Sequence, residues 1–308
     1  FEYLESSVSY GWSDHQIATG IETVSAVSGG TVSEYLYPRG CATSDGVAHC
    51  AYQLNATVLT EKIQVVKRAA VAETWSASVN VWDTGSATGF GTRGGYPDIL
   101  THRLINGTER LLVGSWQDLN STNTFRLDYS DDAGATWTML ARGGITNSNT
   151  VTATRMVWDS ISETLIVVFV ENNGGVFTGK VYHSTDYGNS FVRGENVTDV
   201  RAHDMVIVGG YVVYFYLVSA DEYGRLGVKA ATAKSFRLRT YTAGQQHEPG
   251  YVALCVDENR RIHRYFRKTA DPHVVYEAWT DDLGEHWTGT TVATTNTGTA
   301  VTVWDDEA

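Results

Sequence analysis

Two carboxylates and one guanidinium stand at matching places in the sequence and could act together on a substrate. Asp98, Arg155 and Asp204 each lie near the start of an apolar, strand-like segment. Two carboxylates that face one cavity can supply the acid and the base, or the acid and the nucleophile, of glycoside cleavage. The neighbouring positions of this and related segments add candidate ligand-binding residues, which are Tyr96, His203, His247, Glu248 and Tyr251.

The same positions also allow an interpretation without chemistry. Polar residues at strand starts can solvate the rim of a channel or cap the ends of the strands. A metal or other cofactor is not expected. The histidines lack the spacing of a zinc site, and adjacent carboxylates such as Asp131 and Asp132 point to opposite faces of a hairpin.

The elements that would position these residues come from a repeated unit. Segments such as "LLVGSW", "TLIVVFV" and "YVVYFYLV" are rich in β-branched and aromatic residues, and Gly, Asn and Asp bound them. Each unit reads as four antiparallel strands, and a spacing of roughly 45 to 75 residues is typical of propeller blades. The sequence therefore predicts an all-β single domain over 1–308, a β-propeller with blades at 22–90, 94–147, 150–200, 201–246 and 247–296.

A sixth blade is predicted from the two ends of the chain. The segment "TAVTVWDD" at 299–306 resembles "ATRMVWDS" at 153–160 and reads as a first strand. Residues 297–308 together with 1–20 would then form the sixth blade, and the N-terminal segment would close the ring. Six blades is the preferred number, with five or seven as alternatives.

Three copies of a motif, Ser/Thr-x-Asp-x-Gly-x-x-aromatic, end the third strand of a unit. The short Asp side chain can accept backbone N–H groups across a turn, and Gly permits a positive φ. The aromatic ring then opens the next strand and can pack between sheets. The motif residues are Ser130, Asp132, Gly134 and Trp137, then Ser184, Asp186, Gly188 and Phe191, then Thr280, Asp282, Gly284 and Trp287.

The motif resembles the Asp-box, or bacterial neuraminidase repeat, of sialidases, several glucanases and many non-enzymatic propellers. Two weaker copies, "RAAVAETW" and "KAATAKSF", lack both Asp and Gly. The resemblance implies a propeller in which the box serves the scaffold, away from the active pocket. It does not extend to the sialidase signature, an aromatic-Arg-Ile-Pro strand whose arginine binds the substrate carboxylate. The closest strand reads Tyr96-Pro97-Asp98-Ile99, and an acid there would repel that carboxylate.

Charge, cysteines and sequons indicate the setting. The net charge of −12 disfavours nucleic acid as a partner, and no apolar stretch is long enough to insert into a membrane. Cys41 and Cys50 bracket a short turn-rich loop and are expected to form a disulfide, whereas Cys255 reads as a core residue. Four Asn-x-Ser/Thr sequons suit a secreted surface. The chain begins with Phe1, which suggests a processed chain or a fragment.

Three functions remain open on the sequence. The preferred one is a non-catalytic recognition propeller, extracellular, on a cell surface or on a viral particle, which binds glycan or a partner protein. The second is a glycoside hydrolase or polysaccharide lyase that uses Asp98 and Asp204, assisted by Arg155. The third is an architectural module that packs against other subunits of a larger assembly.

Overall fold

The computed structural model describes residues 2–7, 11–16, 34–57, 60–69, 75–83, 95–104, 106–119, 122–218, 224–240, 247–257, 259–268, 271–294 and 304–306. These residues form strands and turns, and none of them belongs to a helix that could cross a membrane. By its internal contacts the chain divides into two compact units, Phe1–Thr154 and Arg155–Ala308.

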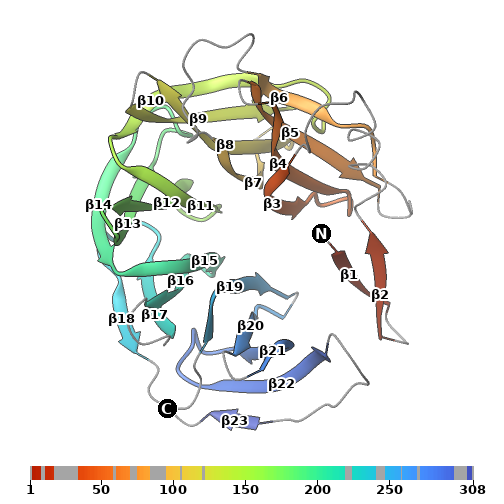
Figure 1. The fold of residues 1–308 in the computed structure, drawn as a ribbon, viewed down its shortest axis with the longest axis vertical. Helices are drawn as coiled ribbons and strands as arrows, with labels where there is room; N and C mark the ends of the chain where they lie inside the picture. The colour runs from red at the N-terminus through yellow and green to blue at the C-terminus, as the bar shows by residue number, and fades with distance from the viewer. Residues whose placement is uncertain are drawn as a thin grey trace. The chain divides into compact units, whose positions relative to one another are not determined.

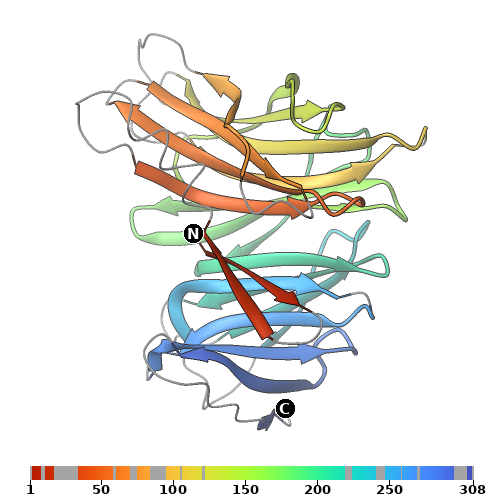
Figure 2. The same ribbon diagram turned by 90° about the vertical axis from the view of Figure 1, so that its right-hand side faces the viewer.

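The first unit contains a hairpin and two four-stranded antiparallel sheets (Figures 1 and 2). The hairpin pairs β1 (Glu2–Ser7) with β2 (Gly11–Gln16). The next sheet runs in the order β3 (Glu34–Ala42), β4 (Ala48–Thr57), β5 (Thr60–Arg68) and β6 (Val79–Asp83). The following sheet contains β7 (Gly95–Arg103), β8 (Glu109–Leu119), β9 (Thr122–Ser130) and β10 (Thr138–Asn147).

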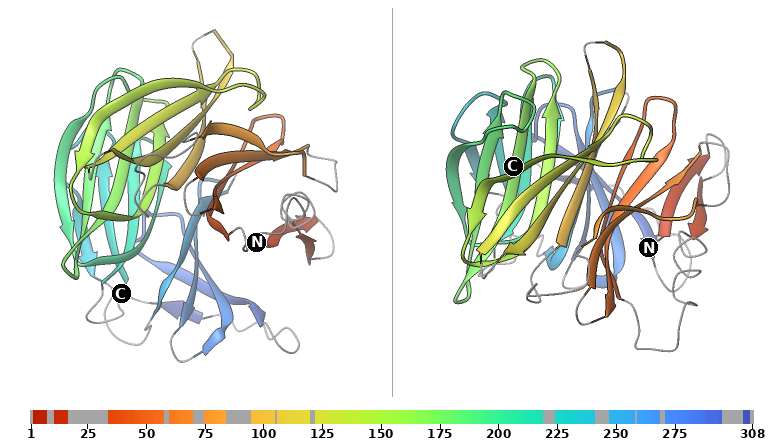
Figure 3. Two further views of the ribbon diagram at one scale, coloured as in Figure 1. Left: turned by 45° about the horizontal axis from the view of Figure 1, so that its top comes forward. Right: turned by 90° about the horizontal axis from the view of Figure 1, so that it is seen from above.

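Three further sheets continue the same order along the chain (Figures 1 and 3). The first contains β11 (Thr150–Asp159), β12 (Thr164–Asn173), β13 (Val176–Ser184) and β14 (Val192–Thr198). The second contains β15 (Val200–Val208), β16 (Tyr211–Val218), β17 (Gly224–Ala230) and β18 (Arg237–Thr240). The third contains β19 (His247–Val256), β20 (Ile262–Lys268), β21 (Asp271–Thr280), β22 (Trp287–Thr294) and β23 (Trp304–Asp306).

The prediction of four-stranded antiparallel blades is confirmed, but the predicted number of blades is wrong. The described residues form five blades rather than six. Residues 304–306 do not start a new blade, because β23 pairs with the outer strand β22, where Trp304 lies opposite Gly289. The open edge of β22 offers unpaired backbone groups that a short strand can satisfy. β1 and β2 form a sheet of their own, so closure by the N-terminus stays a prediction.

The second strands β12 and β16 show how sheets can stack on both faces of a strand. In β12, residues 164–171 are all buried, so this strand is covered on both faces. Residues 212–216 of β16 are at most 1% exposed. The outer strand β14 is mostly exposed. Continuous apolar runs fit strands that have a sheet on either side, whereas an outer strand faces solvent.

Two apolar clusters lie between successive blades. In the first unit, Val65 and Trp82 pack with Ile99 and Val113, and Trp137 lies against this cluster. In the second unit, a larger cluster joins the β15–β18 sheet to the β19–β22 sheet. Its members include Val213, Phe215, Leu226, Ile262, Phe266 and Trp287.

The predicted disulfide is absent, because Cys41 and Cys50 are free thiols. In the pairing of β3 with β4, Cys41 lies opposite His49, and Cys50 lies opposite Gly40. Opposed residues share a face of a sheet, and successive residues alternate between faces. The two sulfurs therefore point to opposite faces and cannot bond without movement of the backbone. Cys255 is exposed rather than a core residue.

Candidate functional site

The first strands of several blades share an irregularity near their starts. The register shifts between Leu36 and Arg39 in β3, between Gly95 and Asp98 in β7, and between Val200 and His203 in β15. β19 has a corresponding shift between His247 and Val252. Such bulges redirect the side chains that follow them and are common beside functional sites. The sequence-predicted candidates cluster at these bulges.

Tyr96 and Asp98 occupy the bulge of β7 in the first unit. Tyr96 has a φ of 47°, which is unusual for a residue with a bulky side chain. The preceding Gly95 has a φ of 117°, and a Cβ there would come within 1.6 Å of Gln53 Oε1. Asp98 is 6% exposed, and its Oδ1 accepts a hydrogen bond from Ile99 N at 3.0 Å. Strain of this kind marks Tyr96 as a candidate contact residue.

Arg155 and Asp204 meet in the second unit. Arg155 Nε donates to Asp204 Oδ1 at 2.7 Å, and the two side chains are 7% and 13% exposed. The same Oδ1 accepts a hydrogen bond from Met205 N at 2.9 Å, and Oδ2 accepts one from Leu254 N at 2.7 Å. Asp204 therefore links the first strands of three successive blades, β11, β15 and β19.

This geometry limits what Asp204 can do chemically. Both carboxylate oxygens already accept hydrogen bonds, and one of them belongs to an ion pair. An ionised carboxylate only accepts hydrogen bonds, so it cannot deliver a proton to a leaving group. Attack on a substrate would require it to leave Arg155 and Leu254 N. The arrangement fits a brace between strands better than a nucleophile. Asp98 belongs to the first unit, so the geometry within each unit does not pair the two carboxylates.

Among the remaining candidates around β15 and β19, the structure describes the side chain of His203. His203 is 2% exposed, and its ring meets the edge of the Tyr214 ring at a centroid distance of 5.5 Å. This histidine belongs to the packing beneath the strand start. His247, Glu248 and Tyr251 belong to β19, and their side chains lie outside the described residues.

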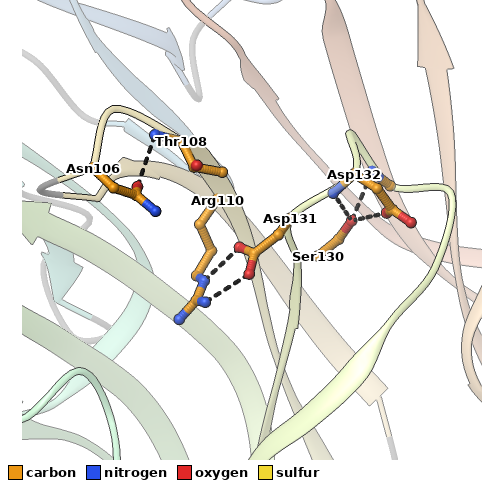
Figure 4. A network of polar contacts seen from close by, with 7 residues as sticks. Asn106, Thr108, Arg110, Ser130, Asp131 and Asp132 are labelled. Atoms are coloured by element: carbon orange, nitrogen blue, oxygen red, sulfur yellow. Dashed lines mark hydrogen bonds and ion pairs between the residues drawn. The ribbon is translucent and has the colours of Figure 1, made fainter.

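The first Ser-x-Asp-x-Gly motif forms a closed network at the β9–β10 turn (Figure 4). Ser130 Oγ donates to Asp132 Oδ1 at 2.7 Å and accepts a hydrogen bond from Gly134 N at 2.8 Å. Asp132 Oδ1 also accepts from Thr136 N at 2.8 Å, and Oδ2 accepts from the Thr136 hydroxyl at 2.5 Å. These hydrogen bonds, those from Thr136 first, lower the pKa of Asp132 to about 2.

The motif turns at 184–191 and 280–287 repeat this network. Asp186 Oδ1 accepts from Ser190 N at 2.8 Å, and Asp282 Oδ1 accepts from Glu285 N at 2.8 Å. In all three turns the residue before the glycine also has a positive φ, which the motif by itself does not predict. These residues are Ala133, Tyr187 and Leu283. Each of the three aspartates therefore accepts hydrogen bonds within its own turn.

No group of three or more His, Cys, Asp or Glu residues within the described ranges is arranged to hold a metal ion. The adjacent carboxylates Asp131 and Asp132 do not form such a group either. Asp131 pairs with Arg110 at 2.7 Å, whereas Asp132 turns into the motif network (Figure 4). The two side chains therefore do not converge.

Sequence reasoning missed Arg264, which is 1% exposed inside the second unit. Its guanidinium lies 4.8 Å from the Phe215 ring centroid, 4.7 Å from that of Phe266 and 4.6 Å from that of Trp287. Planar guanidinium groups stack on aromatic rings in this way. The available signal was the place of Arg264 in "RIHRYF", where it shares a strand face with Ile262 and Phe266.

A comparison with protein-family models found no match, and a comparison with curated protein sequences found none either. Solved structures do resemble the chain. A Hadza microbial sialidase matches 84% of the chain with a TM-score of 0.66 and 12% identity. The α-L-arabinanase of Penicillium chrysogenum matches 88% with a TM-score of 0.56 and 13% identity. A sialidase from Streptococcus pneumoniae matches 85% with a TM-score of 0.58 and 9% identity.

The chain has the fold of a sialidase-like β-propeller. Identities this low support the shared fold and leave the reaction open. The match spans 59% of the Hadza sialidase, 62% of the streptococcal sialidase and 93% of the arabinanase.

Proposed function

We propose that this chain is a carbohydrate-binding β-propeller that holds glycan at the start of β7 without cleaving it. The proposal rests on Asp204. This carboxylate accepts hydrogen bonds from Arg155 Nε, Met205 N and Leu254 N, so it serves the scaffold. With Asp204 engaged in this way, the Asp98 and Asp204 pair that the sequence offered for glycoside cleavage is no longer available.

Tyr96 is the residue most suited to contact a sugar. The backbone of Tyr96 has a positive φ, which costs free energy for a bulky residue. Strain of this kind is often kept at positions that set a side chain for function. An aromatic face stacks on the apolar face of a sugar ring. Asp98, two residues later, could accept hydrogen bonds from sugar hydroxyls. A neutral glycan suits the protein better than an acidic one, because the net charge of −12 disfavours acidic ligands.

The proposed setting is extracellular, on a cell surface or on a viral particle, where the partner is a glycan or a glycosylated protein. Two of the sequon asparagines, Asn106 and Asn196, are exposed. Asn106 lies in the β7–β8 turn, where its Oδ1 accepts a hydrogen bond from Thr108 N at 3.0 Å (Figure 4). Exposed sequons are compatible with a secreted protein.

A glycoside hydrolase or polysaccharide lyase is the second candidate. It is favoured by the fold, because a sialidase and an arabinanase are among the solved structures of similar architecture. In this alternative Asp98, which is 6% exposed, would act with a carboxylate other than Asp204.

A glycan array and a hydrolysis screen on the full chain test the proposal. We expect binding to at least one neutral glycan and no turnover. Tyr96→Asn is the informative variant, because Asn tolerates a positive φ and the change therefore removes the ring with little disturbance of the backbone. We expect glycan affinity to fall about tenfold or more, as loss of a stacking ring predicts.

Asp131→Asn is the control, since it changes a carboxylate that pairs with Arg110, opposite His102 near the other end of β7 from Tyr96. Its glycan affinity should equal that of the unaltered chain. Turnover that disappears in Asp98→Asn would refute the non-catalytic proposal in favour of the hydrolase. If the chain neither binds a glycan on the array nor cleaves one in the hydrolysis screen, an architectural module is favoured.

A further inference from the structure

A second candidate site lies in the first unit, beside the first motif turn. A cavity of about 290 Å³ opens between the β3–β6 sheet and the turn that joins β9 to β10. His49 from β4, Val65 and Lys67 from β5, Val79 from β6 and Gly134 from the turn line this cavity. Its size is at the lower end for small-molecule pockets. The glycan proposal uses none of these residues.

His49 is the feature that points to a ligand. It is 1% exposed, and neither ring nitrogen has a hydrogen-bond partner in the described structure. Its Nδ1 points toward the turn, 3.7 Å from the place that a Cβ on Gly134 would occupy. A buried imidazole without partners is uncommon and calls for an explanation, such as a group that binds in the adjoining space.

Lys67 supplies a positive charge on the same face of the sheet. It lies directly opposite His49 in the pairing of β4 with β5. Its Nζ donates one hydrogen bond, to Ala133 O at 3.2 Å. An ammonium group carries three donors, so two remain for a ligand. The nearby acids are engaged elsewhere, because Glu109 accepts hydrogen bonds from Ser44, and Asp45 accepts them from Thr43 and Val47.

The rest of the cavity is apolar. Val65 lies opposite Val79 in the pairing of β5 with β6, and residues 65 and 67 share a face of the sheet. A ligand with its polar end at Lys67 would therefore extend its other end along valine side chains. Burial first, and then the charge of Lys67, lower the pKa of His49, so the neutral imidazole is favoured and offers one N–H donor to a ligand.

We propose that this pocket binds a small monocarboxylate with a short aliphatic tail. One carboxylate oxygen accepts a hydrogen bond from Lys67 Nζ, and the other accepts one from the N–H of His49. The tail lies against Val65 and Val79. The site is independent of the glycan site, and its loss leaves the proposed glycan binding unchanged.

Titration of the full chain with butyrate, followed by NMR and calorimetry, tests the site. We expect butyrate to shift the imidazole signals of His49, which the His49→Phe variant identifies. Butyramide has the same shape without the charge, and it should bind at least about tenfold more weakly. Lys67→Met should lower butyrate affinity by a similar factor, because it removes the ammonium and retains the chain length.

Lys62→Met is the matched control. Lys62 lies on the same strand five positions earlier, so its side chain projects from the opposite face of the sheet. Its butyrate affinity should match that of the unaltered chain. The proposal is refuted if butyrate leaves the His49 signals unmoved, if butyramide binds as well as butyrate, or if both lysine variants lose affinity equally. If His49→Phe does not fold, the butyrate affinity of Lys67→Met, measured by calorimetry, still tests the proposal.

Discussion

At the scale of single residues, Asp132 accepts hydrogen bonds from three groups of its own turn, and one substitution can test what they contribute to stability. Asp132→Ala removes the acceptor of Thr136 N, of the Thr136 hydroxyl and of the Ser130 hydroxyl. We expect a loss of about 1–2 kcal/mol in the free energy of unfolding, as for other side chains that cap backbone N–H groups. Urea denaturation measures it.

Asp131→Ala is the control for this prediction, because it alters the adjacent carboxylate. Asp131 forms a bidentate ion pair with Arg110 in which its side chain is 40% exposed. Ion pairs of this kind contribute about 0–1 kcal/mol. An Asp131→Ala loss as large as that of Asp132→Ala would contradict the assignment of the turn network to Asp132.

The same residue predicts a pH dependence. The pKa of Asp132 is lowered from 3.8 to about 2 in the folded chain, first by the Thr136 hydroxyl. Folding therefore favours the ionised form, and its contribution is complete above the unfolded pKa and disappears as the pH falls through the folded pKa. We expect the difference in unfolding free energy between the unaltered chain and Asp132→Asn to shrink between about pH 4 and pH 2. A constant difference over that range would contradict the lowered pKa.

At the scale of the elements, Arg155 and Asp204 hold the first strands of adjacent blades together. Arg155→Met leaves a mostly buried carboxylate without its counter-ion, although Met205 N and Leu254 N still donate to it. Removal of one partner of such a pair costs about 3–5 kcal/mol. Thermal and urea unfolding measure the loss.

Arg110→Met provides the matched comparison, since the same change breaks the more exposed Arg110–Asp131 pair. We expect a loss of about 1 kcal/mol there. The double variant Arg155→Met/Asp204→Leu should be more stable than Arg155→Met alone, because it no longer buries an unpaired charge. If Arg155→Met were as mild as Arg110→Met, Asp204 would be free for chemistry and the hydrolase would regain support.

Packing between two sheets gives a second prediction at this scale. Trp287 is 2% exposed within the cluster that joins the β15–β18 and β19–β22 sheets, and Arg264 stacks on its ring. Trp287→Ala should cost about 3–5 kcal/mol by chemical denaturation. Trp279, half-buried beneath Arg261, serves as the comparison, and Trp279→Ala should cost clearly less.

At the scale of the whole molecule, charge determines which partners are disfavoured. A net charge of −12 repels polyanions. We expect no binding to duplex DNA at about 0.15 M salt, where the residual attraction of local basic patches is screened. Fluorescence anisotropy measures it, and a complex that persists at this salt would contradict the exclusion of nucleic acid.

The sequence determined the features that depend on neighbours along the chain. Apolar runs of strand length between Gly and Asp turns predicted the four-stranded blade, because the same order of strands and turns repeats in each unit. Side chains four residues apart, such as Asp132 and Thr136, can meet within one turn, and this contact does not depend on the tertiary structure. Propeller architecture follows from repeating such units, so it was predictable as well.

Only the tertiary structure decided the features that depend on the register between strands and on which strands pair at the edge of a sheet. The Cys41–Cys50 loop looked suitable for a disulfide, but the register of β3 against β4 turned the sulfurs apart. The last strand resembled the start of a blade, but it paired with the edge of β22. Arg155 and Asp204 were expected to face a ligand, and they bind each other because folding brings residues 49 positions apart within 2.7 Å. The pocket of His49 and Lys67 arises in the same way, since it forms only where two sheets meet.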